Sequence, residues 1–277
     1  MIALNRNIGY EILYNYKKLN YKITSILMLI LSIFIIFSIK KYFELNISSI
    51  NNSNMWDLYS FAYIDTDTLI NVLFFFSLYF TSNCFNHSSF EMFIQIRGNN
   101  FFKWFSSKII SIFIFNIIIS TITAILLIVI GISTIGYSLK WSSMAQDFCQ
   151  YSKFYSPQKV VCFNIITYSF LVTFLSEILG ILFLKFKNNK IPMIMSIIYF
   201  IVDKFIFNFG KSIMHLLRYL SLNSYLIFAN REFYKGTTDY ITVKAGIIIP
   251  IFLMIFIHMA AKVFFKIKFL RLDKYND

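Results

Sequence analysis

The sequence predicts an all-α, polytopic membrane protein with six transmembrane helices. Apolar residues make up 58% of the 277 residues and charged residues only 14%, whereas about a quarter of a soluble domain is charged. Six separate apolar runs lie along the chain, each close to the ~20 residues that an α-helix needs to cross a hydrocarbon core. The runs are continuously apolar rather than alternating in twos, so the pattern does not predict a transmembrane β-barrel.

The first 22 residues predict an amphipathic helix that lies at the membrane interface. Apolar residues recur there at helical spacing among lysines and an arginine: Ile8, Ile12, Leu13, Tyr16 and Leu19. The alternative is a plain basic flank that orients the first span, and both interpretations place this segment in the cytoplasm. No small-residue cleavage site follows the first apolar run, so we expect the first span to be retained.

Six spans are expected in chain order, and we treat residues 1–277 as a single transmembrane domain. The spans cover about residues 23–39, 69–85, 109–132, 160–184, 191–209 and 243–264. Pro192 stands near the start of the fifth, where a helix tolerates proline.

The connections between the spans set the expected topology. Residues 40–68 form the only net-acidic connection and suit the outside, whereas the short basic turn at residues 185–190 suits the inside. Residues 210–242 contain two amphipathic pieces that are too short to span, and we expect them to be short outer helices between spans five and six. Both termini are then cytoplasmic.

The net charge is +13, with 26 Lys and Arg against 13 Asp and Glu. In a membrane protein, basic loops hold the topology and contact anionic lipid headgroups, so no nucleic-acid partner is expected. The three cysteines lack the spacing of metal ligands. A disulfide between Cys149 and Cys162, both expected near the outer face, is one alternative; three unpaired thiols are the other.

Residues 86–108 form a basic, aromatic segment between the second and third spans. Arg97, Lys103 and Lys108 place it on the cytoplasmic side by the positive-inside rule. Its phenylalanines and Trp104 are expected at the lipid headgroup level or in the groove of a partner. Because a span anchors each of its ends, this segment is predicted to be a docking element.

Motifs that would give the chain its own enzymatic chemistry are absent from the sequence. It contains no GxxxxGK[ST] loop for binding a nucleotide, no HExxH and no GxSxG, and its three histidines are isolated. We therefore expect no catalytic residues, no metal site and no cofactor in this chain.

Three polar residues stand inside the predicted spans. Glu177 lies in the fourth span, roughly 10 Å from its inner end at 1.5 Å per residue, where a carboxylate is costly and should face a partner rather than lipid. Asn116 lies at a similar depth in the third span, so we expect the two to face each other or a shared cavity. Two roles remain open for Glu177, a structural one and a direct one on a transport path. Asp203 in the fifth span would also need a partner.

This arrangement resembles the membrane subunits of ABC exporters of the type-2 permease superfamily. The resemblance covers the layout of the whole chain: an interfacial helix, six spans and outer helices before the last span. The segment FEMFIQIRGNNFFKWFSSK, with Glu91, Arg97, Gly98 and Lys108, is similar to the coupling helix of that family and the start of its third span.

The resemblance implies a function and a set of partners. The chain would be a permease subunit in the bacterial cytoplasmic membrane, paired with a second permease subunit, identical or different. Two copies of a separate ATP-binding subunit would bind ATP and Mg. Residues expected to couple to that ATPase are Glu91, Arg97, Gly98, Phe101 and Trp104, and those expected on the translocation path are Glu177, Asn116 and Asp203.

The cargo implied by the resemblance is a peptide, a drug or a lipid-like amphiphile. Two other classes compete with an exporter. One is a non-transporting membrane protein that acts in immunity or as a sensor. The other is a secondary transporter, although such proteins usually show internal repeats and none is found in this sequence.

Overall fold

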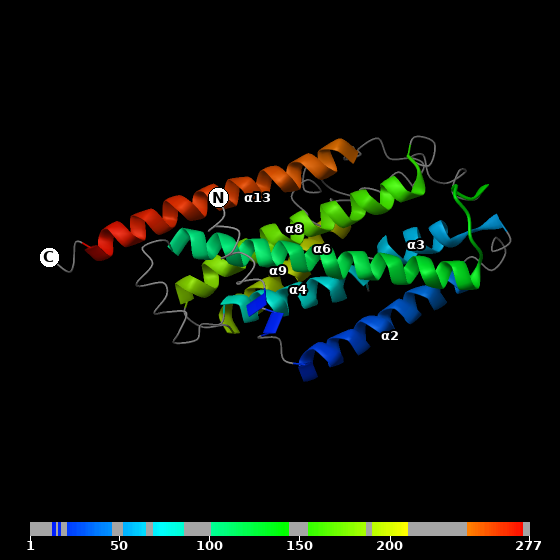
Figure 1. Ribbon diagram of the computed structural model, residues 1–277, viewed down its shortest axis with the longest axis horizontal. Coiled ribbons are helices and arrows are strands. Elements are labelled where there is room, and N and C mark those ends of the chain that lie inside the picture. Colours follow the sequence, from blue (N-terminus) through cyan, green and yellow to red (C-terminus); the bar gives the residue numbers. More distant parts are fainter. Residues whose placement is uncertain are drawn as a thin grey trace.

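The structure, a computed structural model, describes residues 13–14, 16–17, 21–45, 52–64, 69–85, 101–143, 155–186, 190–209 and 243–273. In these ranges the chain is helical and contains no strand, which confirms the predicted all-α class. Figure 1 shows the helices packed lengthwise into an elongated bundle. They are, in order, α2 (Tyr21–Leu45), α3 (Met55–Ile64), α4 (Leu69–Phe85), α6 (Phe101–Thr134), α8 (Pro157–Phe186), α9 (Lys190–Phe209) and α13 (Val243–Asp273).

Three of these helices are long and apolar enough to cross a membrane, which indicates a membrane protein. They cover Lys22–Glu44 in α2, Phe102–Thr134 in α6 and Pro157–Phe186 in α8. The helices at the other three expected spans carry shorter apolar stretches: Leu73–Phe85 in α4, Ile194–Asp203 in α9 and Ile247–Val263 in α13. The count of six spans therefore stays a prediction.

Helices α6 and α8 pack side by side and form the centre of the bundle. α13 lies along α8, and α9 contacts α8 as well. α3 and α4 follow each other along α6, and α2 packs on both of them. Every element in this arrangement is thus connected to the α6–α8 pair, directly or through one neighbour.

Residues 40–68, expected to be a connecting loop on the outside, contain helix α3. It is buried against α6, with Leu58, Tyr59 and Ala62 fully covered. Its first turn is capped: the side-chain oxygen of Asn54 accepts the N–H of Trp56 at 2.9 Å, and Asp57 accepts the N–H of Asn54 at 2.7 Å. This reciprocal arrangement is a capping box. With ten residues the helix is too short for the length rule that identifies spans.

Helix α6 begins at Phe101 rather than near residue 109 and ends at Thr134. Close to its end, Gly131 lies against the backbone of Met55, and a Cβ there would come within 2.9 Å of the Met55 Cα. Gly136 then adopts a φ of 129°, a conformation open to glycine, and its N–H bonds the carbonyl of Gly131. Gly131 therefore lets α3 approach α6 closely, and Gly136 lets the chain turn away from the end of α6.

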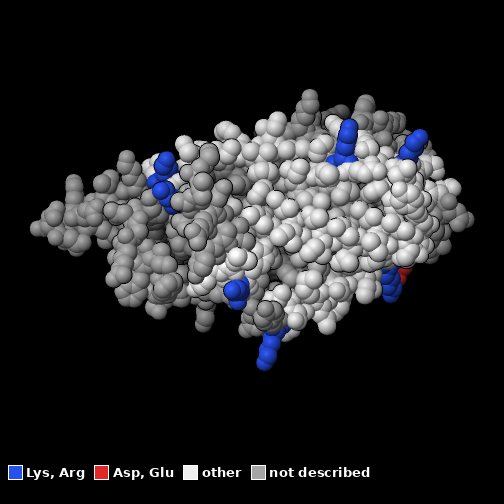
Figure 2. All heavy atoms as spheres, in the orientation of Figure 1, with Lys and Arg blue, Asp and Glu red and all other residues white. Residues whose placement is uncertain are grey.

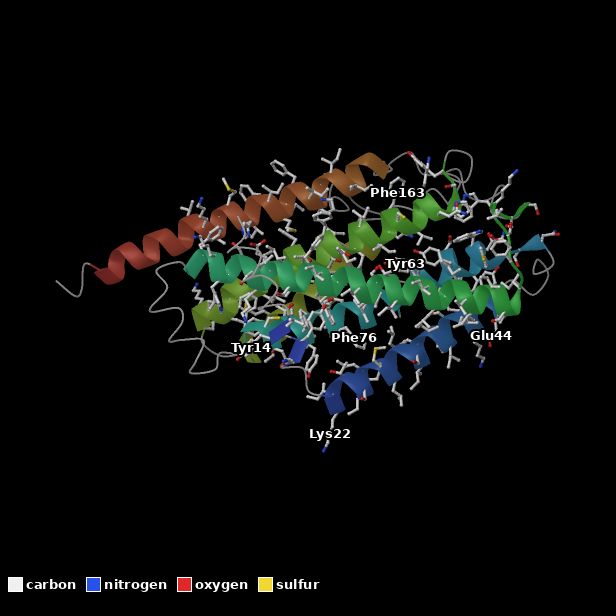
Figure 3. The ribbon with its side chains drawn as sticks, in the orientation of Figure 1. Tyr14, Lys22, Glu44, Tyr63, Phe76 and Phe163 are labelled. Carbon is white, nitrogen blue, oxygen red and sulfur yellow. The ribbon has the colours of Figure 1, made fainter. Side chains whose placement is uncertain are left out.

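The outer surface of the helices is largely apolar. Figure 2 shows a broad uncharged area on one face, with separate Lys and Arg side chains around it. On α2, Lys22 and Glu44 mark the two ends (Figure 3), and most of the side chains exposed between them are apolar, among them Ile26, Leu29, Ile33, Ile36 and Phe37. Such a surface suits contact with lipid acyl chains rather than water.

Candidate functional site

A column of buried polar side chains runs through the centre of the bundle. Helix α8 supplies more of them than any other helix described: Asn164, Thr167, Tyr168, Thr173, Ser176 and Glu177. In an apolar interior, polar groups are costly unless they are hydrogen-bonded. The partners of these residues on other helices therefore define the candidate site, which we call the polar column.

At one end of the column, α3 provides two tyrosines. The Tyr63 hydroxyl lies 2.6 Å from the Ser120 hydroxyl on α6, and Figure 3 labels Tyr63 in the middle of the bundle. One turn earlier, the Tyr59 hydroxyl accepts a longer bond of 3.4 Å from the Asn164 side-chain amide on α8. The short helix α3 thus takes part in the site.

The middle of the column joins α4, α6 and α8. Ser77 donates to the side-chain oxygen of Asn116 at 2.5 Å, and its hydroxyl also lies 3.3 Å from that of Tyr168. Asn116 in turn donates from its amide nitrogen to Thr173 at 3.0 Å. Asn116 is completely buried, and its amide uses both its oxygen and its nitrogen between helices.

At the other end of the column, Glu177, His258 and Ser106 bring three helices together. The Glu177 carboxylate oxygen Oε1 lies 2.5 Å from Nδ1 of His258 on α13. The second ring nitrogen, Nε2, lies 3.1 Å from the Ser106 hydroxyl on α6. The Glu177 side chain is fully buried, whereas that of His258 is 30% exposed. We call these three residues the Glu–His–Ser cluster.

The structure gives the predicted intramembrane residues different partners from those expected. Glu177 is buried against His258, a residue that looks isolated in the sequence. Asn116 bonds Ser77 and Thr173 instead of Glu177. Thr173 stands one turn before Glu177 on the same face of α8. Asn116 therefore contacts the face of α8 that carries Glu177, but it does so one turn before the glutamate, at Thr173.

Asp203 is buried on α9. The hydroxyl of Tyr199, one turn earlier on the same helix, hydrogen-bonds its carboxylate. One partner of the carboxylate is therefore local. Spacing of four residues between Tyr199 and Asp203 is the signal that identifies it.

The predicted coupling residues fall mostly outside the described ranges. Glu91, Arg97 and Gly98 lie there, and Phe101 is the first residue of α6. Trp104 is 8% exposed, and its ring packs edge-on against Phe85 of α4 at 6.1 Å.

Lys108 is also buried rather than displayed on a basic surface. Its ammonium group lies 5.5 Å from the ring centroid of Tyr14 and 5.6 Å from that of Trp104. Aromatic faces attract a cation in this position. Nearby, Tyr16 packs against Phe80 and Phe115, whereas Leu13 is 64% exposed. The N-terminal segment therefore contributes two rings to the bundle.

The described residues hold no group of three His, Cys, Asp or Glu side chains that could bind a metal ion. Cys84 is buried and Cys162 is exposed, and neither forms a disulfide within the described part of the chain. Cys149 lies outside the described ranges.

Comparison with known proteins adds no relative to these observations. No family model, no curated protein and no solved structure matches this chain. What can be inferred about function therefore depends on the helices and contacts described above.

Proposed function

We propose that this chain is the permease subunit of an ATP-driven exporter of the type-2 ABC superfamily, in the bacterial cytoplasmic membrane. In this proposal it crosses the membrane six times with both termini in the cytoplasm. It pairs with a second permease subunit, a copy or a relative, and with two copies of a separate subunit that binds ATP and Mg. The cargo is a peptide, a drug or a lipid-like amphiphile.

One observation carries the proposal: α6 continues without a break from the basic segment into the bundle. Its 34 residues correspond to about 51 Å at 1.5 Å per residue, well beyond the ~30 Å of a hydrocarbon core. A force applied where α6 begins would therefore be transmitted along a single rigid helix. This geometry is what an exporter driven from the cytoplasm requires.

The base of this helix is held by contacts on two sides. Trp104 and Phe105 pack against Phe85 at the end of α4. Ser106 contacts His258 of α13. A displacement of the first turns of α6 would consequently move α4 and α13 as well. In the proposal, Glu91, Arg97, Gly98 and Phe101 contact the ATPase. Trp104 instead anchors the first turn of α6 to α4 through Phe85.

Co-purification tests the proposal. The tagged chain is extracted in a mild detergent, and proteins bound to it are identified by mass spectrometry and assayed for ATP hydrolysis. We expect a P-loop ATPase to co-elute, and we expect Arg97→Glu combined with Phe101→Ala to reduce its amount at least about tenfold, because a docked charge pair and an aromatic anchor are each worth more than about 1 kcal/mol.

Lys140→Glu is the matched control. Lys140 is exposed beyond the other end of α6, so the same reversal of charge there should leave the ATPase bound. Retention of the ATPase by the Arg97/Phe101 double variant would contradict docking through this segment. Failure to recover any ATPase would contradict the proposed function itself.

A secondary transporter is the second candidate, and the Glu–His–Ser cluster is the observation that favours it. Buried acid–base pairs inside membrane proteins are frequent in proton relays. The two candidates are distinguished by the energy source: a proton ionophore would stop a proton-coupled transporter, whereas depletion of ATP with the proton gradient maintained would stop an exporter.

A further inference from the structure

The Glu–His–Ser cluster has the connectivity of a nucleophilic triad. An acid contacts one nitrogen of an imidazole, and a hydroxyl contacts the other. A serine activated in this way must donate its proton to the imidazole. Whether Ser106 does so is decided by its other hydrogen bond.

The Ser106 hydroxyl donates to the backbone carbonyl of Phe102 at 2.8 Å. A hydroxyl has one proton to donate, so at its 3.1 Å contact with His258 the Ser106 oxygen accepts. The donor in that contact is therefore the Nε2–H of the imidazole. This is the opposite of the direction that a nucleophilic serine needs, and the geometry points away from acyl transfer.

The same reasoning sets the number of protons in the cluster. Nε2 carries one proton, and a second must lie between Nδ1 and Glu177 Oε1, because two unprotonated acceptors 2.5 Å apart would repel each other. With two protons, Glu177 and His258 together carry no net charge, whether as an ion pair or as two neutral groups. A neutral pair is the arrangement that costs least in a buried site.

We propose that Glu177, His258 and Ser106 form a proton-binding site whose occupancy holds α13 against α6 and α8. Within the described parts of the chain, the side-chain hydrogen bonds from α13 to both of these helices come from His258. The His258 ring is partly exposed at the surface of the bundle, so the site is not sealed inside it. The other carboxylate oxygen, Glu177 Oε2, is buried and has no hydrogen-bond partner among the described residues, so an excess charge has no local compensation.

The charges around the site come from all three helices. Glu177 is the only acid on α6 and α8, and α13 has none before Asp273. The basic residues on these helices nearest to the site in sequence are Lys103 and Lys108 of α6, Lys185 of α8 and Lys262 of α13. Lys262 lies 5.8 Å from the ring of Phe102, which itself lies 4.9 Å from the His258 ring. Lys262 thus lies near the site, with the Phe102 ring between it and His258.

Loss of the Nε2 proton changes the contacts of two helices at once. The pair becomes negative, and Ser106 must turn its hydroxyl from the Phe102 carbonyl toward the ring to keep a bond. Otherwise the contact between α13 and α6 is lost. Raising the pH should therefore loosen α13, and this effect does not depend on which transport function the chain performs.

The first test reads the protonated nitrogen directly. The full chain, labelled with ¹⁵N in its three histidines, is placed in lipid nanodiscs and studied by NMR near neutral pH. His258→Gln identifies the His258 signals by their disappearance. We expect Nε2 of His258 to carry a proton. A His258 protonated only on Nδ1 would overturn the proposal and restore the triad interpretation.

The second test measures how tightly α13 is held. Hydrogen exchange of amides in residues 247–263 is compared with that of residues 119–123 of α6 in the same sample, which removes the intrinsic effect of pH on exchange. Above the pH at which the proton leaves, we expect the relative exchange of α13 to rise about tenfold per pH unit, the dependence of a single linked proton.

Variants separate the proposal from general instability. Glu177→Gln keeps the size of the side chain and removes its ionisation, so the rise with pH should disappear, as it should in His258→Gln. His215→Gln removes a histidine at a different place in the chain and should retain the rise. A wild-type protein without the rise, or a Glu177→Gln variant that retains it, would overturn the proposal. If a variant folds poorly, the hydrogen-exchange comparison within the wild type still decides, because it needs no variant.

Discussion

Asn116 shows at the scale of one residue how the bundle is held together. Its amide accepts from Ser77 of α4 and donates to Thr173 of α8, so one side chain of α6 bonds two other helices. Hydrogen bonds between membrane helices contribute on average about 0.6 kcal/mol each, with some near 1.7. Asn116 therefore combines two such bonds at a fully buried position.

Replacing Asn116 by leucine should destabilise the protein. Both bonds are lost and Thr173 loses its described donor, so we expect the free energy of unfolding to fall by about 1–2 kcal/mol. The measurement is unfolding by a denaturing detergent in mixed micelles, followed by tryptophan fluorescence.

Asn83→Leu provides the control for this experiment. Asn83 donates to the carbonyl of Tyr79 within its own helix, so the same substitution removes no bond between helices. Equal losses of stability in the two variants would contradict a bridging role for Asn116.

The deep glutamate illustrates which residue contacts the sequence can and cannot predict. The cost of a carboxylate in an apolar span predicts that Glu177 has a partner, and the structure supplies His258. The identity of that partner could not be predicted, because His258 lies 81 positions along the chain from Glu177 and no local spacing links them. Only the packing of α13 on α8 brings the two together.

At the scale of one element, α3 is the least expected part of the fold. Ten residues containing Asp57 and Ser60 do not satisfy a rule based on long apolar runs. The sequence signal for the start of α3 was the pair Asn54 and Asp57, which are three residues apart, the spacing of a capping box. Two further bonds fix this end: Asn54 donates to the carbonyl of Lys140, and the Trp56 indole to that of Ser138.

The start of α6 could not be placed from hydropathy either. Residues 101–108 include Lys103 and Lys108, which look like part of a basic loop. In the structure, Tyr14 and Trp104 cover Lys108, so its charge no longer prevents the helix from being packed. The contact between Tyr14 of the N-terminal segment and Lys108 thus helps to bury the start of α6.

Asp57 in the α3 cap leads to a prediction about pH. Burial raises the pKa of its carboxyl above the ordinary value, against the opposing effect of hydrogen bonds from Asn54 and Ser142. Between the unfolded and folded pKa values, the folded protein binds the proton more readily than the unfolded chain. The stabilisation from this group is therefore complete below the unfolded pKa and is lost as the pH rises through the folded pKa.

The prediction is checked by the difference between wild type and Asp57→Asn, which cannot ionise at this position. Thermal unfolding in detergent is measured across the acidic range, and the advantage of the wild type should decrease as the pH rises. Glu44→Gln is the control, since Glu44 is an exposed acid paired with Lys40 on α2. An advantage that grows with pH would mean that the charged form of Asp57 is the stabilising one.

At the scale of the whole molecule, the class of the protein followed from composition, and its internal arrangement did not. Continuous apolar runs predicted helices, and α4 has the bounds expected for the second span. Which helices pack together depends on contacts between distant residues, such as Tyr63 with Ser120 and Gly131 with Met55. These pairs carry no signature in a single sequence.

The topology can be tested at the two ends of α6. Lys103 and Ser143 are both exposed, on either side of this apolar helix. In a chain whose three native cysteines are replaced, Ser143→Cys should react with an impermeant thiol reagent added outside intact cells. Lys103→Cys should react only after the membrane is opened, because basic segments remain inside.

Both cysteines become accessible in opened membranes, which serves as the positive control. The reverse pattern in intact cells would invert the proposed orientation and place residues 86–108 outside, away from any ATPase. Reaction of both positions from the outside would mean that α6 does not cross the bilayer.

The contact between Tyr14 and Lys108 also orders events during biosynthesis. Synthesis proceeds from the amino end at about 5–20 residues per second, so on the order of ten seconds separates the appearance of these two residues. During that interval the tyrosine has no ammonium group to cover, and α2 and α4 leave the ribosome first. The N-terminal segment therefore reaches its final position only after the first turns of α6 have been synthesised.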